Sequence, residues 1–162
     1  MRSIGPATIF CPLAFAICAL SVLAQTPNPY GAPISLETAK KVAARALAEA
    51  AKNNWAETVA IVDPGGSLVY FERMDNTNNA SANISIGKAR TAALFKRPSK
   101  AFQDALAAGG LGLRVLRLKD AMPLEGGVPL VESGKVIGAI GVSGDAADRD
   151  SQCANAGAEA LK

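Results

Sequence analysis

Hydrophobic and polar positions recur with two different periods along this chain, and each period predicts one kind of element. Apolar residues follow helical spacing from Leu36 to about Lys52, and Ser35 before them is a good N-cap, so we expect an amphipathic helix there. The stretch ETVAIVDPGGSLVYFERM then holds two β-rich runs on either side of Asp63-Pro64-Gly65-Gly66. Because proline and glycine at that point favour a tight turn, this stretch predicts a β-hairpin.

The second half of the chain continues with the same two periods. Helical spacing returns on both sides of Pro98 and again near the C-terminus, whereas GGVPLVESGKVIGAIGVSG predicts a second hairpin. The segment LRVLRLKD is ambiguous, and a short strand fits it slightly better than a helix. The expected elements are helices over 83–96, 99–107 and 148–161 and a hairpin over 126–144. Since hairpins dominate and no βαβ repeat occurs, the predicted fold class is α+β, an antiparallel β-sheet with flanking helices.

The N-terminus predicts an export signal ahead of a single domain. Residues 7–23 are apolar and uncharged, Arg2 precedes them, and Val22-Leu23-Ala24 is a small-residue cleavage pattern, so residues 1–24 fit a secretory signal peptide. The alternative is a membrane anchor, but the apolar run is slightly shorter than the roughly 20 residues that a spanning helix needs. We expect residues 25–33 to form a flexible arm and residues 34–162 one domain of a periplasmic or secreted protein, with no membrane attachment after cleavage.

Composition narrows the chemistry that this domain can perform. The chain has no histidine, which removes the usual catalytic base, the Ser-His-Asp triad and the commonest metal ligand, and we predict no metal site. Cys153 is the one cysteine left after cleavage, and we expect a small buried residue on a helix rather than a reactive thiol. The net charge of +3 is small and scattered, so nucleic acid is not a predicted partner.

The second hairpin carries six glycines, although glycine weakens strands. Gly138, Gly141 and Gly144 are three residues apart, but the dinucleotide fingerprint needs G-x-G-x-x-G after a strand, and here the first two glycines lie within the strand. The alternation of side chains along a strand instead places three small residues, Ala139, Gly141 and Ser143, on the same face. We call this the thin face. Such a face lets a ligand or another backbone approach closely. We favour a packed helix or a neighbouring subunit over a ligand.

The helix over 83–96 carries a charge on its apolar side. At about 100° per residue, Ile84 and Phe95 lie at the centre of the apolar arc, and Lys88 and Thr91 fall inside the same arc. A lysine there costs free energy unless its ammonium reaches water, an anion or a partner. Lys88 is therefore either a lysine at the helix rim, with its head in solvent, or part of an anion-recognising pair with Thr91 that lines a pocket against the thin sheet face.

Four segments, in this order, resemble one known family. VAIVDPGGSLVYFERMD, GKARTAALFKRPS, LEGGVPLVESGKVIGAIGVSG and CANAGAEAL are similar to the GlcG/HbpS family, also called the haem-degrading-domain family and related to the PduO C-terminal domain. The resemblance covers about 34–161. It implies a profilin-like or PAS-like fold and a homo-oligomer. Some members bind haem, some are fused to corrinoid adenosyltransferases, and others accompany the breakdown of small organic acids or aromatics.

Carried over by position, the resemblance points to the segments KARTAALF and EGGVP as the two sides of a ligand site. The end of the first hairpin completes this predicted ligand-binding site. Its residues are Lys88, Thr91 and Phe95 from the helix, Glu125, Gly126 and Gly127 from the turn, and Arg73 and Asp75 from the hairpin. With no histidine, an axial haem ligand must be another residue or absent. The available types are Tyr70, Met74, Lys88 and Met122.

Three functions are open. The first, which we favour, is an exported binder of haem or another tetrapyrrole, in which Lys88 and an arginine hold the propionates while Phe95 and Met74 contact the macrocycle. The second is a small enzyme acting on an organic acid by proton transfer or hydration, with Glu125 as acid or base beside two backbone donors. The third is a non-catalytic oligomeric sensor or assembly module. We also expect self-association, because the thin face and an alanine-rich terminal helix allow close packing.

Overall fold

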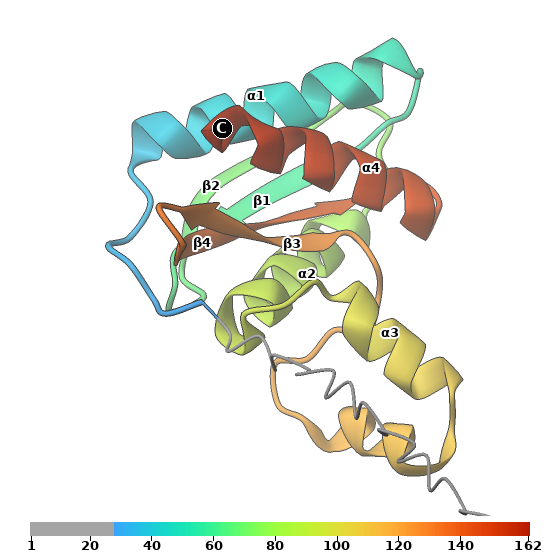
Figure 1. The fold of residues 1–162 in the computed structure, drawn as a ribbon. Helices are drawn as coiled ribbons and strands as arrows, with labels where there is room; N and C mark the ends of the chain where they lie inside the picture. The colour runs from blue at the N-terminus through green and yellow to red at the C-terminus, as the bar shows by residue number, and fades with distance from the viewer. Residues whose placement is uncertain (1–27) are drawn as a thin grey trace, which may run out of the picture.

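The computed structural model describes residues 28–162, and the predicted signal peptide lies outside them. Its centre is a four-stranded antiparallel sheet in the order β2-β1-β4-β3, built from two hairpins (Figure 1). The strands are β1 (Thr58–Val62), β2 (Leu68–Arg73), β3 (Gly127–Glu132) and β4 (Lys135–Ser143). The inner strands β1 and β4 belong to different hairpins, so their pairing joins the two halves of the sequence into one sheet.

Helices cover both faces of this sheet (Figure 1). Helices α1 (Leu36–Lys52) and α4 (Ala147–Ala158) lie side by side over one face, and α2 (Ser81–Phe95) lies across the other. After α2 the chain forms α3 (Lys100–Ala107) and a 3-10 helix, η1 (Gly110–Arg117), which pack on each other beneath the sheet in the view of Figure 1. A short 3-10 turn, η2 (Glu159–Leu161), follows α4. The predicted α+β class and antiparallel sheet are therefore confirmed.

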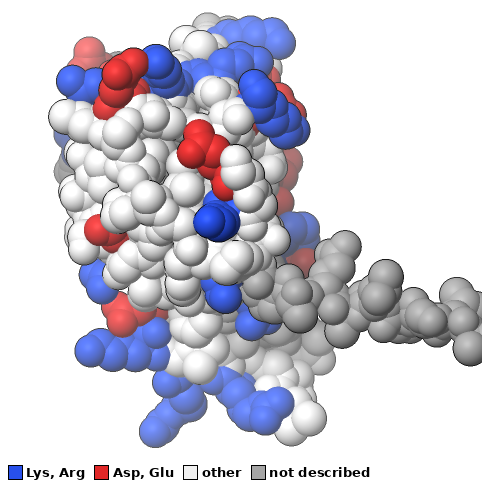
Figure 2. Space-filling model, turned by 60° about the vertical axis from the view of Figure 1, so that its left-hand side comes forward, with Lys and Arg blue, Asp and Glu red and all other residues white. Residues whose placement is uncertain are grey.

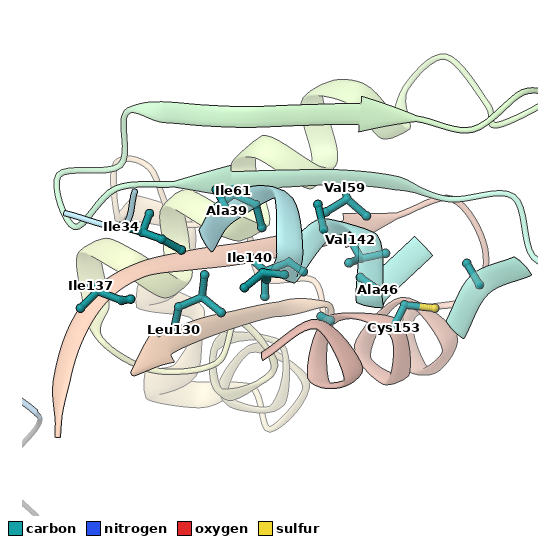
Figure 3. Close-up of a cluster of buried hydrophobic side chains, with 14 residues drawn as sticks. Ile34, Ala39, Ala46, Val59, Ile61, Leu130, Ile137, Ile140, Val142 and Cys153 are labelled. Carbon is teal, nitrogen blue, oxygen red and sulfur yellow. The ribbon is translucent and has the colours of Figure 1, made fainter. Parts of the chain in front are cut away.

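The main hydrophobic core lies between the sheet and the layer of α1 and α4 (Figure 3). Ile140 and Val142 of β4 point into it together with Ala46 of α1 and Cys153 of α4. Cys153 is fully buried, and burial raises the pKa of its thiol to about 12, because the thiolate would lose its hydration. The expectation of a small buried cysteine on a helix is confirmed.

The segment LRVLRLKD forms no strand, contrary to the weak preference of its sequence. Most of it belongs to η1, in which three residues make one turn. Gly112 and Val115 then lie one turn apart on the side that faces α3, and a Cβ built on Gly112 would lie 1.7 Å from the carbonyl oxygen of Ala105. A strand prediction assumes that residues on one side of the chain are two positions apart, whereas in η1 they are three positions apart.

Gly141 lies where α2 crosses β4. A Cβ built on Gly141 would lie 2.0 Å from the carbonyl oxygen of Ser85 and 2.5 Å from the backbone nitrogen of Ala89. The thin face of β4 thus receives a helix of the same chain, as we favoured over a ligand. With the two backbones this close, α2 turns small residues to the sheet. Ile84 and Phe95, expected at the centre of the inward arc, are only half-buried.

Replacing Gly141 should test this close approach. We expect Gly141→Ala to lower the free energy of unfolding by about 1–3 kcal/mol, because the added methyl meets backbone atoms that cannot move aside. Urea denaturation measures the change. The control is Gly65→Ala in the turn of the first hairpin, where the new Cβ would lie 3.3 Å from a side-chain oxygen of Asp63. Equal losses in the two variants would contradict the proposed packing.

The last residues of the expected flexible arm are held against the sheet. The backbone N–H of Gly31 donates to the carbonyl of Val136, and the N–H of Val136 donates to the carbonyl of Pro29, both over 2.9 Å. The Tyr30 hydroxyl donates to the carbonyl oxygens at the end of α2. Within residues 28–162, no helix is long and apolar enough to cross a membrane.

Candidate functional site

Lys88 lies at the centre of a buried polar cluster between α2 and the sheet. Its ammonium donates to Asp150 Oδ2 over 2.5 Å and to the carbonyl oxygen of Val142 over 3.0 Å. The Lys88 side chain is 2% exposed and that of Asp150 is 3% exposed. The inward position that the sequence predicts for Lys88 is therefore real, and its partner is a carboxylate of the same chain.

Asp150 is fully engaged as well. It lies in the first turn of α4, where the helix dipole favours a negative charge. Its Oδ1 accepts from the backbone N–H groups of Gly144 and Asp145 over 3.1 and 3.2 Å, while Oδ2 accepts from Lys88. Each charge of the ion pair thus has good hydrogen-bond partners, which a buried pair requires.

Glu57 is the third member of the cluster, and sequence reasoning missed it. Its side chain is fully buried just before β1, and neither carboxyl oxygen has a hydrogen-bond partner among the described residues. Burial, followed by the negative charge of Asp150, raises the pKa of Glu57 to about 8. Alternation could have revealed it, because Glu57 shares its side of the strand with Val59 and Ile61.

A similar pattern identifies Asp150 in retrospect. Cys153, Ala154 and Gly157 follow it at helical spacing, and all four residues are buried on α4. An aspartate on such a stripe is the complement of the lysine on the inward arc of α2. These two patterns mark both charges as buried, but they do not show that the two side chains meet.

The glycine turn of the predicted site does meet Lys88. Gly126 has φ +117°, and a Cβ on it would lie 2.9 Å from the Lys88 ammonium nitrogen. A Cβ on Gly127 would lie 2.3 Å from the Lys88 carbonyl oxygen, and the N–H of Gly127 donates to Ser99 Oγ over 2.8 Å. The structure brings these segments together as predicted, but the turn closes over the ion pair and leaves it inaccessible to a solute.

Thr91 and Glu125 have structural partners too. The Thr91 hydroxyl accepts from the N–H of Met122 over 2.7 Å and lies 3.2 Å from the carbonyl oxygen of Asp120, so it fastens the segment after η1 to α2. The N–H of Glu125 donates to Gln103, and the Glu125 carboxylate lies 3.9 Å from Lys100. Glu125 directly precedes the glycine turn and Thr91 holds the segment before it, and neither forms a pocket with Lys88.

Arg73 and Asp75 lie at the exposed end of β2. Arg73 donates to the side chain of Asn79 over 3.2 Å, and within residues 28–162 no hydrogen bond or ion pair joins Arg73 or Asp75 to Lys88 or Glu125. These two residues therefore make no direct hydrogen bond or ion pair with Lys88 or Glu125, the charged residues of the helix and the turn.

Phe95, by contrast, lines an open groove. The groove lies between the end of α2, α3 and η1 and has a volume of about 560 Å³, within the range of small-molecule sites. Most of its lining is apolar. The lining residues are Phe95, Arg97, Ala101, Phe102, Ala105, Leu111, Gly112, Arg114, Val115 and Leu118.

Two aromatic rings and two cations give this groove its chemistry. Phe95 and Phe102 pack edge to face with centroids 4.9 Å apart, and the Arg97 guanidinium lies 5.1 Å from the centroid of the Phe102 ring. Arg114 is the second cation on the lining. The groove can therefore hold a flat apolar body that carries acidic groups. Among residues 28–162, no group of three or more Cys, Asp or Glu side chains could hold a metal ion.

Three comparisons with known proteins agree on the family. The sequence profile of the family described as "Haem degrading protein HbpS-like" matches residues 34–159. Protein GlcG of Escherichia coli strain K12 is 41% identical over 110 residues, which is 68% of this chain and 81% of that protein. The crystal structure of HbpS superposes with a TM-score of 0.75 at 30% identity, over 82% of this chain and 92% of that one.

The same fold recurs at a greater distance. The crystal structure of a PduOC:haem complex superposes with a TM-score of 0.72 at 24% identity, and covers 80% of this chain and 96% of that one. The resemblance noted from four sequence segments is confirmed by these matches, which span almost the whole described domain. The chain belongs to the HbpS-like family.

Proposed function

We propose that this protein binds haem or another flat tetrapyrrole in the groove between α2, α3 and η1. The observation that carries the proposal is the combination of the Phe95–Phe102 pair with Arg97 and Arg114 in one groove. Apolar faces of a macrocycle suit the rings, and its carboxylates suit the guanidinium groups, which bind carboxylates in bidentate fashion. Membership in a family described by haem degradation, and the fold shared with the PduOC:haem complex, support this ligand class.

The groove supplies no strong axial ligand. Its lining contains no histidine, cysteine, methionine, tyrosine or lysine among the described residues. The four axial candidates from the sequence all lie outside the lining. Lys88 is buried in its ion pair, Tyr70 donates to Glu72, Met74 Sδ accepts from the N–H of Glu57, and Met122 packs near Gly87. We therefore propose that apolar contact and carboxylate pairing hold the ligand, without axial ligation from these four side chains.

Haem titration followed by the Soret band tests this proposal. We expect Arg97→Ala/Arg114→Ala to weaken haem binding at least tenfold, because each lost charge-assisted hydrogen bond is worth about 1–3 kcal/mol. Both side chains are exposed, so the fold should persist. The matched comparison is Arg73→Ala/Asp75→Asn at the end of β2. A larger loss in that variant would move the site to the hairpin and refute the groove.

The geometry favours a binder over the enzymatic alternative. That alternative needs Glu125 beside free backbone donors, but the N–H of Gly127 is already bonded to Ser99. Export with cleavage after Ala24 and self-association complete our proposal, on the grounds of the sequence. The thin face of β4, one of the two surfaces that suggest self-association, is covered by α2, so self-association would have to use another surface.

A further inference from the structure

We propose that the outward face of η1 docks the protein on an anionic lipid surface, although the sequence alone predicts no membrane attachment after cleavage. We define this face as Leu113, Leu116, Arg117 and Lys119. Leu113 is 53% exposed and Leu116 is 65% exposed, so two large apolar side chains project into solvent on adjacent turns. All four residues differ from those that line the haem groove, so this inference stands apart from the proposed function.

The geometry of η1 creates this separation. With three residues per turn, side chains at every third position lie above one another. Gly112 and Val115 form the column against α3, and Leu118, just after η1, also lines the groove. Leu113 and Leu116 form a second column, which is exposed and takes no part in lining the groove. Arg117 ends η1 and Lys119 follows two residues later, so both cations lie close to these leucines in the chain. A segment with large apolar residues next to lysine and arginine is typical of elements that lie in the interface of a membrane.

The charge around η1 complements an anionic surface. Residues 96–119 contain six lysines and arginines and one aspartate, a net charge of +5, whereas the whole chain carries +3. The rest of the chain is therefore net negative, and the cations concentrate in α3, η1 and their flanks. Figure 2 shows Lys and Arg side chains projecting from the lower end of the molecule, where Figure 1 places α3 and η1. Among the described residues, no ion pair engages Arg117 or Lys119.

A second copy of the chain fits this face less well. A twofold dimer places the same patch on both subunits, so two regions of charge +5 would face each other. An anionic bilayer instead attracts the cations and accepts the leucines at its headgroup boundary. Charge complementarity therefore favours an anionic lipid surface over a second copy of the chain at this face.

Co-sedimentation with vesicles tests the proposal, using the chain from Gln25, which contains every residue of the matched domain. We expect binding to vesicles of equal phosphatidylglycerol and phosphatidylcholine, little binding to pure phosphatidylcholine, and weaker binding in 0.5 M salt (about the range where surface charges are screened). Leu113→Ser/Leu116→Ser should weaken binding at least tenfold, and Arg117→Glu/Lys119→Glu should abolish the preference for phosphatidylglycerol.

The chain offers matched controls for both variants. Leu36→Ser/Leu68→Ser changes two leucines that are 52% and 50% exposed on α1 and β2, and Lys40→Glu/Lys41→Glu makes the same change in charge on α1. Both controls should bind vesicles within twofold of the parent. No binding of the parent to anionic vesicles, or equal losses in the controls, would overturn the proposal. A change of molecular mass in Leu113→Ser/Leu116→Ser with unchanged vesicle binding would assign the face to self-association and also overturn it.

Discussion

Lys88→Met should lower the free energy of unfolding by about 3–5 kcal/mol, because it leaves the buried Asp150 carboxylate without its counter-charge. The backbone donors of Gly144 and Asp145 would remain, but two neutral hydrogen bonds do not replace an ammonium. Urea denaturation at neutral pH measures the loss. Lys88→Met/Asp150→Asn should recover part of it, since the second change removes the orphaned charge.

The control for this prediction lies on the same helix. Arg90 pairs with Asp120 over 3.3 Å, but their side chains are 43% and 31% exposed. Arg90→Met should therefore cost about 0–1 kcal/mol, as exposed pairs do. Equal losses from Lys88→Met and Arg90→Met would show that the Lys88–Asp150 pair is not the buried clamp that the structure describes.

The same variant separates two views of Lys88. A lysine that binds a ligand carboxylate would lose affinity on substitution while the fold persisted. If Lys88 instead pairs with Asp150 behind the Gly126 turn, its substitution lowers the stability of the protein. The haem affinity of the molecules that remain folded is then unchanged. Haem titration of Lys88→Met, without urea and at a temperature where the variant is still folded, therefore measures the ligand-binding role that the sequence predicts.

Glu57→Gln should make the protein more stable at alkaline pH. The pKa of Glu57 is about 8 in the fold and 4.5 as its ordinary value, so folding takes up a proton between these pH values. The stability that the protonated carboxyl provides is fully present below pH 4.5 and is lost as the pH rises towards 8. Glutamine cannot ionise, and we expect the variant to exceed the parent by about 2–4 kcal/mol at pH 9.

Urea midpoints at pH 5, 7 and 9 measure this difference. The parent and Glu57→Gln should differ by less than about 1 kcal/mol at pH 5 and diverge steadily above it. The control is Glu132→Gln, an exposed carboxylate at the end of β3, which should leave the pH profile unchanged. Parallel profiles for the parent and Glu57→Gln would mean that Glu57 is already ionised at neutral pH.

The predicted elements agree with the structure wherever one period dominates. The helix from Leu36 to Lys52 has the bounds that its spacing and the Ser35 cap predict, and Ser35 Oγ accepts from the N–H of Thr38. Both hairpins form where the glycine-containing turns place them. The pattern fails at η1, because a period of three resembles neither of the two templates that predict strands and α-helices.

The site was predictable only in part. Helical periodicity places Lys88 inside, but it cannot show whether the partner is a ligand, water or a carboxylate from 62 residues further along the chain. Phe95 belongs to the groove, yet Arg97 and Arg114 meet there only because Gly112 lets η1 pack against α3. These contacts depend on tertiary packing between segments whose separation in sequence carries no periodic signal.

The order of strands in the sheet also determines when the molecule can fold. The central ladder runs from the pair Val62–Ala139 to the pair Thr58–Ser143, so it joins residues 77 to 85 positions apart. The first hairpin alone has too little sheet to be stable. Ladders between such distant segments form slowly. The growing chain thus holds no finished sheet until nearly all of it has been made. A chain that folds late remains threadable through a secretion channel for longer, which suits the export that we propose.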